Sequence, residues 1–493
     1  MIRRIILAAS LSLGANALAA DPDANALYQK HCADCHDPSR LGGTGPALIP
    51  QTLRRMYGPK MHDVIANGRV ATQMIGYSDV LNSAEIDALA TYLETPLAEV
   101  PNWTPDDITA SRNMREDYMP AAAPVWDADP MNITLVVETG DHHVSVLDGD
   151  TFEVLDRFAT PFAVHGGPKF SPDGRYVFIM SRDGWVQKYD IWALQEVGQV
   201  RAGVNSRNIA MSSDGKHLAV ANYLPMSLTI LSTDDLSVEK VIDVVGSDGT
   251  ASRVSAVYQA PQRASYVLAL KDTPEIWEIS TDPETLFERR RIMLSEPLDD
   301  FFFSPDYRFL IGAARASDQG VVVNLSEGKE VANLPLAGMP HLGSGISWMR
   351  GDDRVLATPH LREGMISVID MNTWTLVKTI KTDGPGFFMR SHENSPYVWA
   401  DVFFGPNKDK LHVIDKQTLE IVKTLDPEPG KTVAHVEFTK DGKYALVSIW
   451  EDDGAVIIYD AATLQEVKRL PMRKPSGKYN VWNKISFSDG TSH

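Results

Sequence analysis

A repeat of about 45 residues covers the later part of the chain and limits its fold more than any other feature. Eight strand-like apolar segments end in polar turns near residues 148, 190, 232, 280, 324, 370, 415 and 460. A second motif, Phe-Ser-Pro-Asp-Gly-Arg-Tyr at 170–176, recurs between these turns, and its Asp-Gly step predicts a hairpin. Four strands in each repeat make one blade of a β-propeller, and the long even period favours this closed ring over a β-sandwich array. We therefore predict an all-β eight-bladed β-propeller over residues 131–493.

A second feature, Cys-Ala-Asp-Cys-His at residues 32–36, is the attachment motif for c-type haem. In this motif the thiols of Cys32 and Cys35 bond to the haem vinyl groups, and His36 becomes an iron ligand. The chain has 2 cysteines in all, so no disulfide framework competes for them. The alternatives are a reducible cysteine pair or half of a zinc site, but zinc requires two further ligands at similar spacing. The motif predicts one covalently bound haem c and transfer of single electrons.

The residues around this motif predict a small all-α domain over residues 20–100. Residues 23–31 have helical spacing and lead directly into the haem motif. Residues 83–94 begin with Ser83 as the expected cap and place their apolar side chains on one helical face. With the haem motif, these segments resemble class I cytochromes c, and the later segment resembles the C-terminal helix of that fold.

The resemblance to class I cytochromes c also implies how the haem iron is held. In that fold a proline carbonyl accepts a hydrogen bond from the proximal histidine, and Pro46 matches this proline. The implied sixth ligand is Met74, although this chain has Met-Ile where the family usually has Met-Pro. Met56, Met61 and His62 are the alternatives. Ligation by histidine and methionine would raise the haem potential.

The first residues read as an export signal. Arg3 and Arg4 precede an apolar stretch, and Ala17-Leu18-Ala19 fits a cleavage site, so we expect a signal peptide over residues 1–19. The mature protein is then expected in the periplasm, where bacteria attach c-type haem. No later stretch reaches the roughly 18 apolar residues that a membrane span requires.

The net charge limits the classes of partner that the protein can bind. A formal net charge of −18 argues against nucleic acid, whose binding requires clustered Lys and Arg. Residues 101–130 contain 5 prolines and little periodicity, so we expect a linker or a segment that wraps around a domain.

The predicted propeller resembles the haem d1 domain of the cytochrome cd1 nitrite reductase family. This resemblance implies that haem d1 or its dihydro form binds non-covalently in the propeller. In the family, the histidine that matches His165 is the proximal ligand of the haem d1 iron, and those that match His341 and His360 lie on the distal face. The matching segments are residues 162–165, 171–192, 339–345, 357–360, 391–395 and 476–481.

Further cofactor-binding candidates follow from the carboxylates of haem d1, which require cations suited to bidentate pairing. Arg207 and Arg253 match arginines of the family pattern, and Arg182, Tyr223 and His392 are additional candidates. The alternative for each arginine is a surface ion pair, and for each histidine a structural role.

Two departures from the nitrite reductases indicate another branch of the family. About a dozen residues separate the expected cleavage site from the haem motif, so we expect the N-terminal arm that places a tyrosine over haem d1 in some reductases to be missing. His435 stands where the reductase pattern has no ligand. A distal ligand at this position would close the iron to nitrite. Both departures resemble the dihydro-haem d1 dehydrogenases of the family.

That resemblance implies oxidation of a propionate side chain of dihydro-haem d1 to an acrylate, the last step of haem d1 biosynthesis, with electrons passed to haem c. His341 and Tyr479 are the candidate base and proton relay, and His165 and His435 the candidate iron ligands. A phenol with a pKa near 10 is a poor base at neutral pH. A cd1-type nitrite reductase and a non-catalytic haem d1 carrier are the alternatives. The expected partners are dihydro-haem d1, a small periplasmic electron acceptor, and the nitrite reductase or its maturation proteins.

Overall fold

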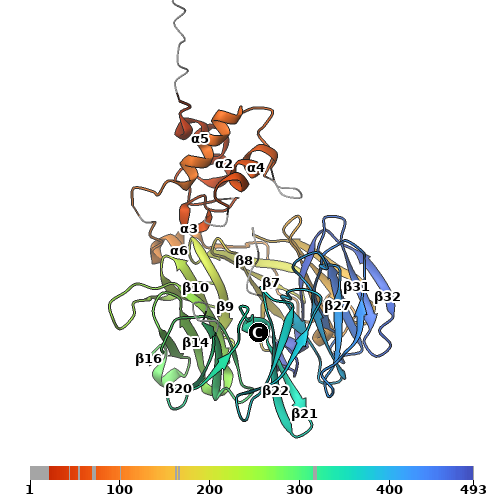
Figure 1. Cartoon of the computed structure of the whole chain (residues 1–493). Helices are drawn as coiled ribbons and strands as arrows, with labels where there is room; N and C mark the ends of the chain where they lie inside the picture. Colours follow the sequence, from red (N-terminus) through yellow and green to blue (C-terminus); the bar gives the residue numbers. More distant parts are fainter. Residues whose placement is uncertain are drawn as a thin grey trace, which may run out of the picture.

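The computed structural model describes residues 21–43, 45–53, 56–68, 74–99, 101–161, 164, 167–314 and 319–491. A small helical domain lies against one end of a ring of eight β-sheets (Figure 1). The described helices of this domain are α1 (Ala24–His31), α2 (Ala33–His36), α3 (Pro50–Leu53), α4 (Pro59–Asn67) and α5 (Ser83–Glu94).

The two predicted helices of the first domain are present as α1 and α5. The predicted cap was wrong by one residue, because Asn82 caps α5 instead of Ser83. The Asn82 side chain accepts from the backbone N–H of Glu85 at 3.1 Å, and the Glu85 carboxylate accepts from the Asn82 N–H at 2.9 Å. This reciprocal pair satisfies two donors that a helix start leaves open. Apolar side chains of α5 then pack against Tyr28 of α1 and form the core of the domain.

The second domain is an eight-bladed propeller, as the repeat predicts. Each sheet has four antiparallel strands, and one sheet gains the short strand β1 (Asn113–Met114) as a fifth. Four blades contain β2 (Ile133–Glu138), β3 (His143–Asp148), β4 (Val154–Ala159) and β33 (Pro475–Asn480); β5 (Lys169–Phe170), β6 (Tyr176–Met180), β7 (Trp185–Asp190) and β8 (Gln195–Arg201); β9 (Asn205–Met211), β10 (His217–Leu224), β11 (Ser227–Ser232) and β12 (Val238–Asp243); and β13 (Val254–Ala260), β14 (Ser265–Leu270), β15 (Glu275–Ser280) and β16 (Arg289–Met293).

The other four blades follow the same order along the chain. They contain β17 (Leu298–Phe303), β18 (Phe309–Ala314), β19 (Gln319–Asn324) and β20 (Lys329–Pro335); β21 (Ile346–Arg350), β22 (Asp353–Pro359), β23 (Met365–Asp370) and β24 (Thr375–Lys381); β25 (Met389–Arg390), β26 (Tyr397–Asp401), β27 (Leu411–Asp415) and β28 (Ile421–Leu425); and β29 (Val433–Phe438), β30 (Tyr444–Ile449), β31 (Ala455–Asp460) and β32 (Glu466–Pro471).

The repeat positions in the sequence correspond to one place in every blade. Each predicted turn lies at the end of the third strand, as at Asp148 of β3 and Asp460 of β31. The Asp-Gly motif forms the turn between the first and second strands, where Gly174 has φ +72°. The strand β2, the second of its blade, is buried at every position, whereas the outermost strand β32 has only exposed and half-buried residues. Lysines and glutamates on the outer strands discourage pairing with another sheet edge.

The last strand closes the ring by completing the first blade. β33 pairs with β2, so that Tyr479 lies opposite Leu135 and Asn480 opposite Thr134. The buried Asn480 amide donates to Asn132 Oδ1 and Thr134 Oγ1, both at 3.2 Å. The helix α7 (Val481–Ser486) follows directly and is capped by the same asparagine. Closure therefore places residues from the chain's end beside its first blade.

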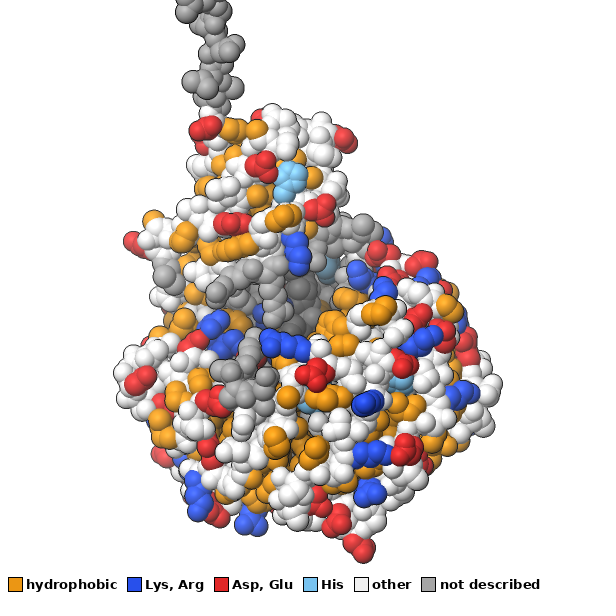
Figure 2. All heavy atoms as spheres, viewed as in Figure 1, with side chains coloured by type: hydrophobic (Ala, Val, Ile, Leu, Met, Phe, Trp, Pro, Cys, Tyr) orange, Lys and Arg blue, Asp and Glu red, His pale blue; other side chains and the backbone are white. Residues whose placement is uncertain are grey.

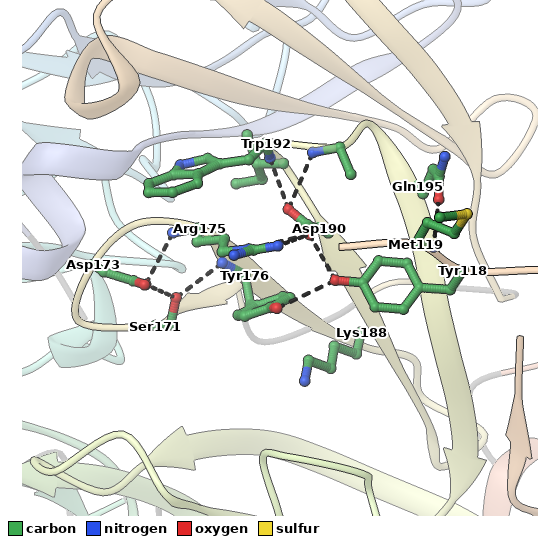
Figure 3. A network of polar contacts seen from close by, with 12 residues as sticks. Tyr118, Met119, Ser171, Asp173, Arg175, Tyr176, Lys188, Asp190, Trp192 and Gln195 are labelled. Carbon is green, nitrogen blue, oxygen red and sulfur yellow. Dashed lines mark hydrogen bonds and ion pairs between the residues drawn. The ribbon is translucent and has the colours of Figure 1, made fainter. Parts of the chain in front are cut away.

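Residues 101–130 lie along the β5–β8 blade of the propeller and include the helix α6 (Pro105–Ser111) as well as β1. Figure 3 shows Tyr118 of this segment donating to the buried Asp190 carboxylate, at 2.7 Å, where Arg175 also donates at 2.8 Å. Trp103 donates to the carbonyl of Arg201 at 2.8 Å. The segment is thus held on the blade of β5 to β8 along its length.

The helical domain contacts this blade and the next. Arg201 at the end of β8 donates to the carbonyls of Leu41 at 2.6 Å and Gly42 at 3.2 Å. Beside it lies an apolar cluster shared by both domains, made of Ala47, Ile49, Val204 and Leu224. Asn205, at the start of the inner strand β9, donates to the carbonyl of Gln51 at 3.4 Å. The helical domain therefore lies at the end of the propeller where the inner strands start.

Acidic and basic side chains are interspersed over the propeller rim on the face seen in Figure 2. The described part of that face therefore has no continuous basic surface, which agrees with the negative net charge of the chain. Among the described residues, every helix is too short or too polar to cross a bilayer.

Candidate functional site

The first candidate centre is the haem c site of the helical domain. His36 is buried, and its Nδ1 donates to the carbonyl of Pro46 at 2.8 Å, which confirms the predicted hydrogen bond. This bond leaves Nε2 to face an iron. Gly45 allows the ring to lie so close, because a Cβ there would stand 2.6 Å from His36 Cε1. Cys32 and Cys35 are free thiols beside this histidine, so these residues fit a covalent haem c.

The alternatives to Met74 as sixth ligand have other contacts. Met61 is buried in the core of the helical domain, and Met56 packs against the same core. His62 Nε2 lies 3.5 Å from the carboxylate of Asp87 on the surface. Met74 is half-buried on the loop after α4, and its ligation of the iron stays a prediction that these environments support.

A zinc site at the cysteines gains no support. The described residues contain no group of three or more His, Cys, Asp or Glu side chains that could hold a metal ion.

The second candidate centre lies where inner strands of the propeller begin, and its first member is His341. This residue precedes the short helix η4 (Leu342–Ser344). Its Nδ1 donates to the carbonyl of Phe387 at 2.8 Å, which leaves Nε2 unprotonated in the neutral ring. Burial lowers the pKa of His341 below its ordinary value of 6.5, although Asp300 acts in the opposite direction. His341 therefore has the protonation state of a base at neutral pH.

His435 occupies a bulge in β29. Its backbone has φ +50°, in the left-handed region, and the pairing with β30 shifts between Ala434 and Val436. The backbone N–H of Lys478 donates to His435 Nδ1 at 3.3 Å, while Nε2 has no hydrogen bond to a described residue. Burial and then the charge of Lys478 hold the pKa of His435 well below its ordinary value. Iron binding at Nε2 would place the ring proton on Nδ1 and displace the Lys478 contact.

Tyr479 lies next to His435, with ring centroids 5.5 Å apart. Gly477 and Gly167 give the phenol ring its space, because a Cβ at either position would meet it. Burial raises the pKa of Tyr479 to about 12. The phenol is therefore protonated at neutral pH and can donate or relay a proton more readily than it can act as a base.

An aromatic wall joins the two histidines. We use this name for Phe387, Phe388, Phe403 and Phe404, whose rings contact one another. The His341 ring lies 4.3 Å from the Phe387 ring, and the His435 ring lies 4.9 Å from the Phe388 ring. Sequence reasoning missed this wall, although two Phe-Phe pairs at 387–388 and 403–404 were visible. An apolar aromatic wall of this kind suits contact with a macrocycle.

The predicted cations gather around Tyr223. Arg182 and Arg253 each lie 5.5 Å from its ring, and Lys271, which the sequence analysis missed, lies 5.8 Å away. Arg207 lies 3.8 Å from Asp300, a carboxylate that also influences His341. We call Arg182, Arg207, Arg253 and Lys271 the cationic cluster.

Carboxylates already balance part of the cationic cluster. Arg253 pairs with Asp272 through two nitrogens, and Lys271 pairs with Asp299. The cationic cluster can therefore bind anionic groups of a ligand, and these carboxylates compensate part of its charge when no ligand is bound.

The remaining predicted residues are not brought into this group. His360 is fully buried, and both its ring nitrogens have partners, the Ala337 carbonyl at 2.5 Å and Ser367 Oγ at 2.9 Å. It supports the segment that leads into His341, through the bridge between Pro340 and His360. His392 lies beyond the other end of β25 and accepts from the N–H of Asn394. His165 lies outside the described residues.

Comparison with known proteins agrees with both domains. Residues 128–484 match the family described as "Cytochrome D1 heme domain". Residues 19–93 match "Cytochrome C oxidase, cbb3-type, subunit III".

The relatives cover all or nearly all of the chain. A dihydro-heme d1 dehydrogenase of Pseudomonas aeruginosa is 52% identical and covers 100% of both chains. A solved structure of "Dihydro-heme d1 dehydrogenase NirN in complex with DHE" has a TM-score of 0.91 and covers 94% of this chain and 99% of that one. A nitrite reductase of Stutzerimonas stutzeri is 26% identical and covers 93% of this chain and 92% of its own. The chain therefore belongs to the cytochrome D1 heme domain family.

Proposed function

We propose that this protein is a dihydro-haem d1 dehydrogenase that completes haem d1. The reaction converts a –CH₂–CH₂–COO⁻ side chain into –CH=CH–COO⁻ and releases two protons and two electrons. One observation carries the proposal: His341 and His435 contact one aromatic wall and Tyr479 packs against His435, in a chain that is 52% identical to a relative of this name over its full length.

The protonation states of these residues divide the work between them. His341 is neutral, and its Nε2 has no hydrogen bond to a described residue, so it can accept a proton from the substrate side chain. Tyr479 is protonated, so it can donate a hydrogen bond or pass a proton onward. His435 and His165 are the proposed ligands that hold the substrate iron from its two faces.

The cationic cluster binds the carboxylates of the substrate in this proposal. Arginine side chains pair with carboxylates through two parallel hydrogen bonds and so fix orientation as well as affinity. Arg182, Arg207 and Arg253 would hold the edge of the macrocycle, while the aromatic wall packs against its face.

The helical domain supplies the route for electrons. A haem c held by Cys32, Cys35 and His36 would supply one-electron transfer, so each turnover would need two successive transfers and an external acceptor. The contacts of Arg201 with Leu41 and Gly42 fix the helical domain on the end of the propeller that carries the site. We place the reaction in the periplasm, because the Cys-x-x-Cys-His motif and the apolar first residues both fit an exported protein.

The test is turnover by the purified protein with an added one-electron acceptor. We expect an acrylate-bearing product from the wild-type protein, a loss of about 10²- to 10⁴-fold in His341→Gln, and no nitrite reduction after loading with haem d1. Nitrite turnover without conversion of the dihydro substrate would favour the reductase. Binding without either reaction would indicate a carrier.

A further inference from the structure

Asp401 at the end of β26 is a buried carboxylate that connects both candidate histidines through the backbone. Its exposure is 2%. Oδ1 accepts from the backbone N–H groups of Phe387 at 2.8 Å and Phe388 at 3.0 Å. Oδ2 accepts from the N–H of His435 at 3.1 Å. One side chain therefore holds backbone groups from two adjacent blades.

On the His435 side, this contact stabilises an unfavourable backbone conformation. A histidine backbone at φ +50° costs free energy, and it persists only where contacts with its surroundings offset that cost. Asp401 holds the N–H of this residue, and the Lys478 ammonium group holds its carbonyl at 2.7 Å. The Lys478 ammonium also donates to Ser448 Oγ at 2.5 Å, so it is itself anchored. The bulge that aims His435 at the site is thus clamped from both ends of one residue.

On the His341 side, the connection passes through Phe387. The carbonyl of this residue accepts from His341 Nδ1 at 2.8 Å, and its N–H donates to Asp401 at 2.8 Å. The carboxylate fixes the turn, and the turn fixes both the direction and the tautomer of the histidine ring. Gly386 leaves room for this tight turn, because a Cβ there would stand 2.7 Å from the Asp401 carbonyl oxygen.

We propose that Asp401 is a positioning residue that sets the placement of His341 and His435 relative to each other. This inference rests on the proposed function, in which His341 takes a proton from the substrate and His435 binds the iron of the same substrate. Among the described residues, the Asp401 carboxylate accepts hydrogen bonds from three backbone N–H groups, which an amide side chain of the same shape cannot all satisfy.

The experiment compares Asp401→Asn with Asp460→Asn in the full-length protein that carries haem c. Asp460 is a matched control, because its carboxylate also accepts backbone N–H groups, from Ala462 at 3.2 Å and Thr463 at 2.8 Å, but in an outer turn of the same blade as His435. The readouts are kcat and KM, the absorption spectrum after loading with dihydro-haem d1, and amide hydrogen exchange of residues 387–388 and 433–438 without ligand.

We expect Asp401→Asn to lower kcat about 10- to 100-fold with little change in KM, to shift the absorption bands of the loaded protein, and to accelerate exchange at these amides. Asp460→Asn should leave all three unchanged. Wild-type values for kcat and the spectrum in Asp401→Asn would overturn the inference. If Asp401→Asn does not fold, Asp401→Glu, which keeps the charge but lengthens the arm, should show the same spectral shift. If the wild-type protein itself lacks turnover, the proposed function fails, while the loaded spectra and the exchange rates still decide the role of Asp401.

Discussion

At the scale of single residues, burial decides which side chains can exchange protons. It lowers the pKa of His341 and raises that of Tyr479 to about 12, so the two have opposite protonation states at neutral pH. The roles proposed for them follow from this difference. Sequence patterns can propose such residues, but they cannot supply the tautomer, which depends on the Phe387 carbonyl.

The acid limb of the pH profile tests the role of His341. A base must be unprotonated, so activity is present above its pKa and lost as the pH falls through it. Because the pKa of His341 lies below 6.5, we expect kcat/KM to stay level from pH 8 to about 6.5 and to fall only at lower pH. The measurement is a pH–rate profile with buffer controls, and a limb above pH 7 in the wild-type protein would exclude His341 as the base.

A single methyl group at Gly45 tests the haem c site. Gly45→Ala would place Cβ 2.6 Å from His36 Cε1, so the ring must move and its hydrogen bond to Pro46 must weaken. A weaker bond makes the imidazole a poorer donor to the oxidised iron, so we expect a higher midpoint potential in a redox titration.

Gly43→Ala is the control for this change, because its Cβ would meet only the Cys35 backbone, at 3.2 Å. Equal potentials in both variants would argue that the His36 ring tolerates the methyl group.

At the scale of elements, the propeller depends on the pairing of its last strand with its first blade. Asn480 contributes at this seam through two hydrogen bonds and the cap of α7. We expect Asn480→Ala to lower the free energy of unfolding of the propeller by about 2 kcal/mol, because buried donors and acceptors lose their partner. Urea unfolding followed by tryptophan fluorescence measures this, with the haem c spectrum reporting the helical domain separately.

The exposed Asn372, whose amide donates to Asp353 at 3.2 Å in an outer turn, provides the control. Asn372→Ala should change stability by no more than about 0.5 kcal/mol. Equal stability of the two alanine variants would show that the seam does not depend on Asn480.

The elements also show what the sequence could and could not predict. The eight blades were predictable, because each third strand ends in a turn residue at a regular interval. The Asp-Gly turns were predictable as well, even though Tyr307 takes the glycine position in one of them with φ +52°. The bulge at His435 was not, because one extra residue in a strand leaves no periodic signal. The role of Asp401 was not predictable either, since its partners come from two other segments of the chain.

At the scale of the whole molecule, the two domains meet through Arg201. Its guanidinium group donates to the carbonyls of Leu41 and Gly42. The loop of these two residues also contains Pro46, whose carbonyl accepts a hydrogen bond from the proximal histidine, His36. The sequence predicted both domains but not this contact, because neither the haem motif nor the propeller repeat indicates which blade contacts the helical domain.

Loss of this contact should slow electron transfer without changing either site. In Arg201→Met we expect haem c content and substrate binding to stay at wild-type values, while haem c reduction after mixing with substrate slows several-fold. Stopped-flow absorption measures the rate. The control is Arg469→Met, which removes an exposed ion pair with Glu428 on an outer strand. Wild-type reduction rates in Arg201→Met would mean that the other contacts between the domains hold them together without Arg201.

The central claim, that this protein oxidises dihydro-haem d1, is tested most directly by a single turnover. The protein is purified with haem c but without haem d1, mixed anaerobically with dihydro-haem d1, and followed by visible spectroscopy and by the mass of the extracted tetrapyrrole. We predict a loss of two mass units, matched by two electrons found on haem c and an added acceptor. Tight binding with unchanged mass and oxidised haem c would contradict the claim.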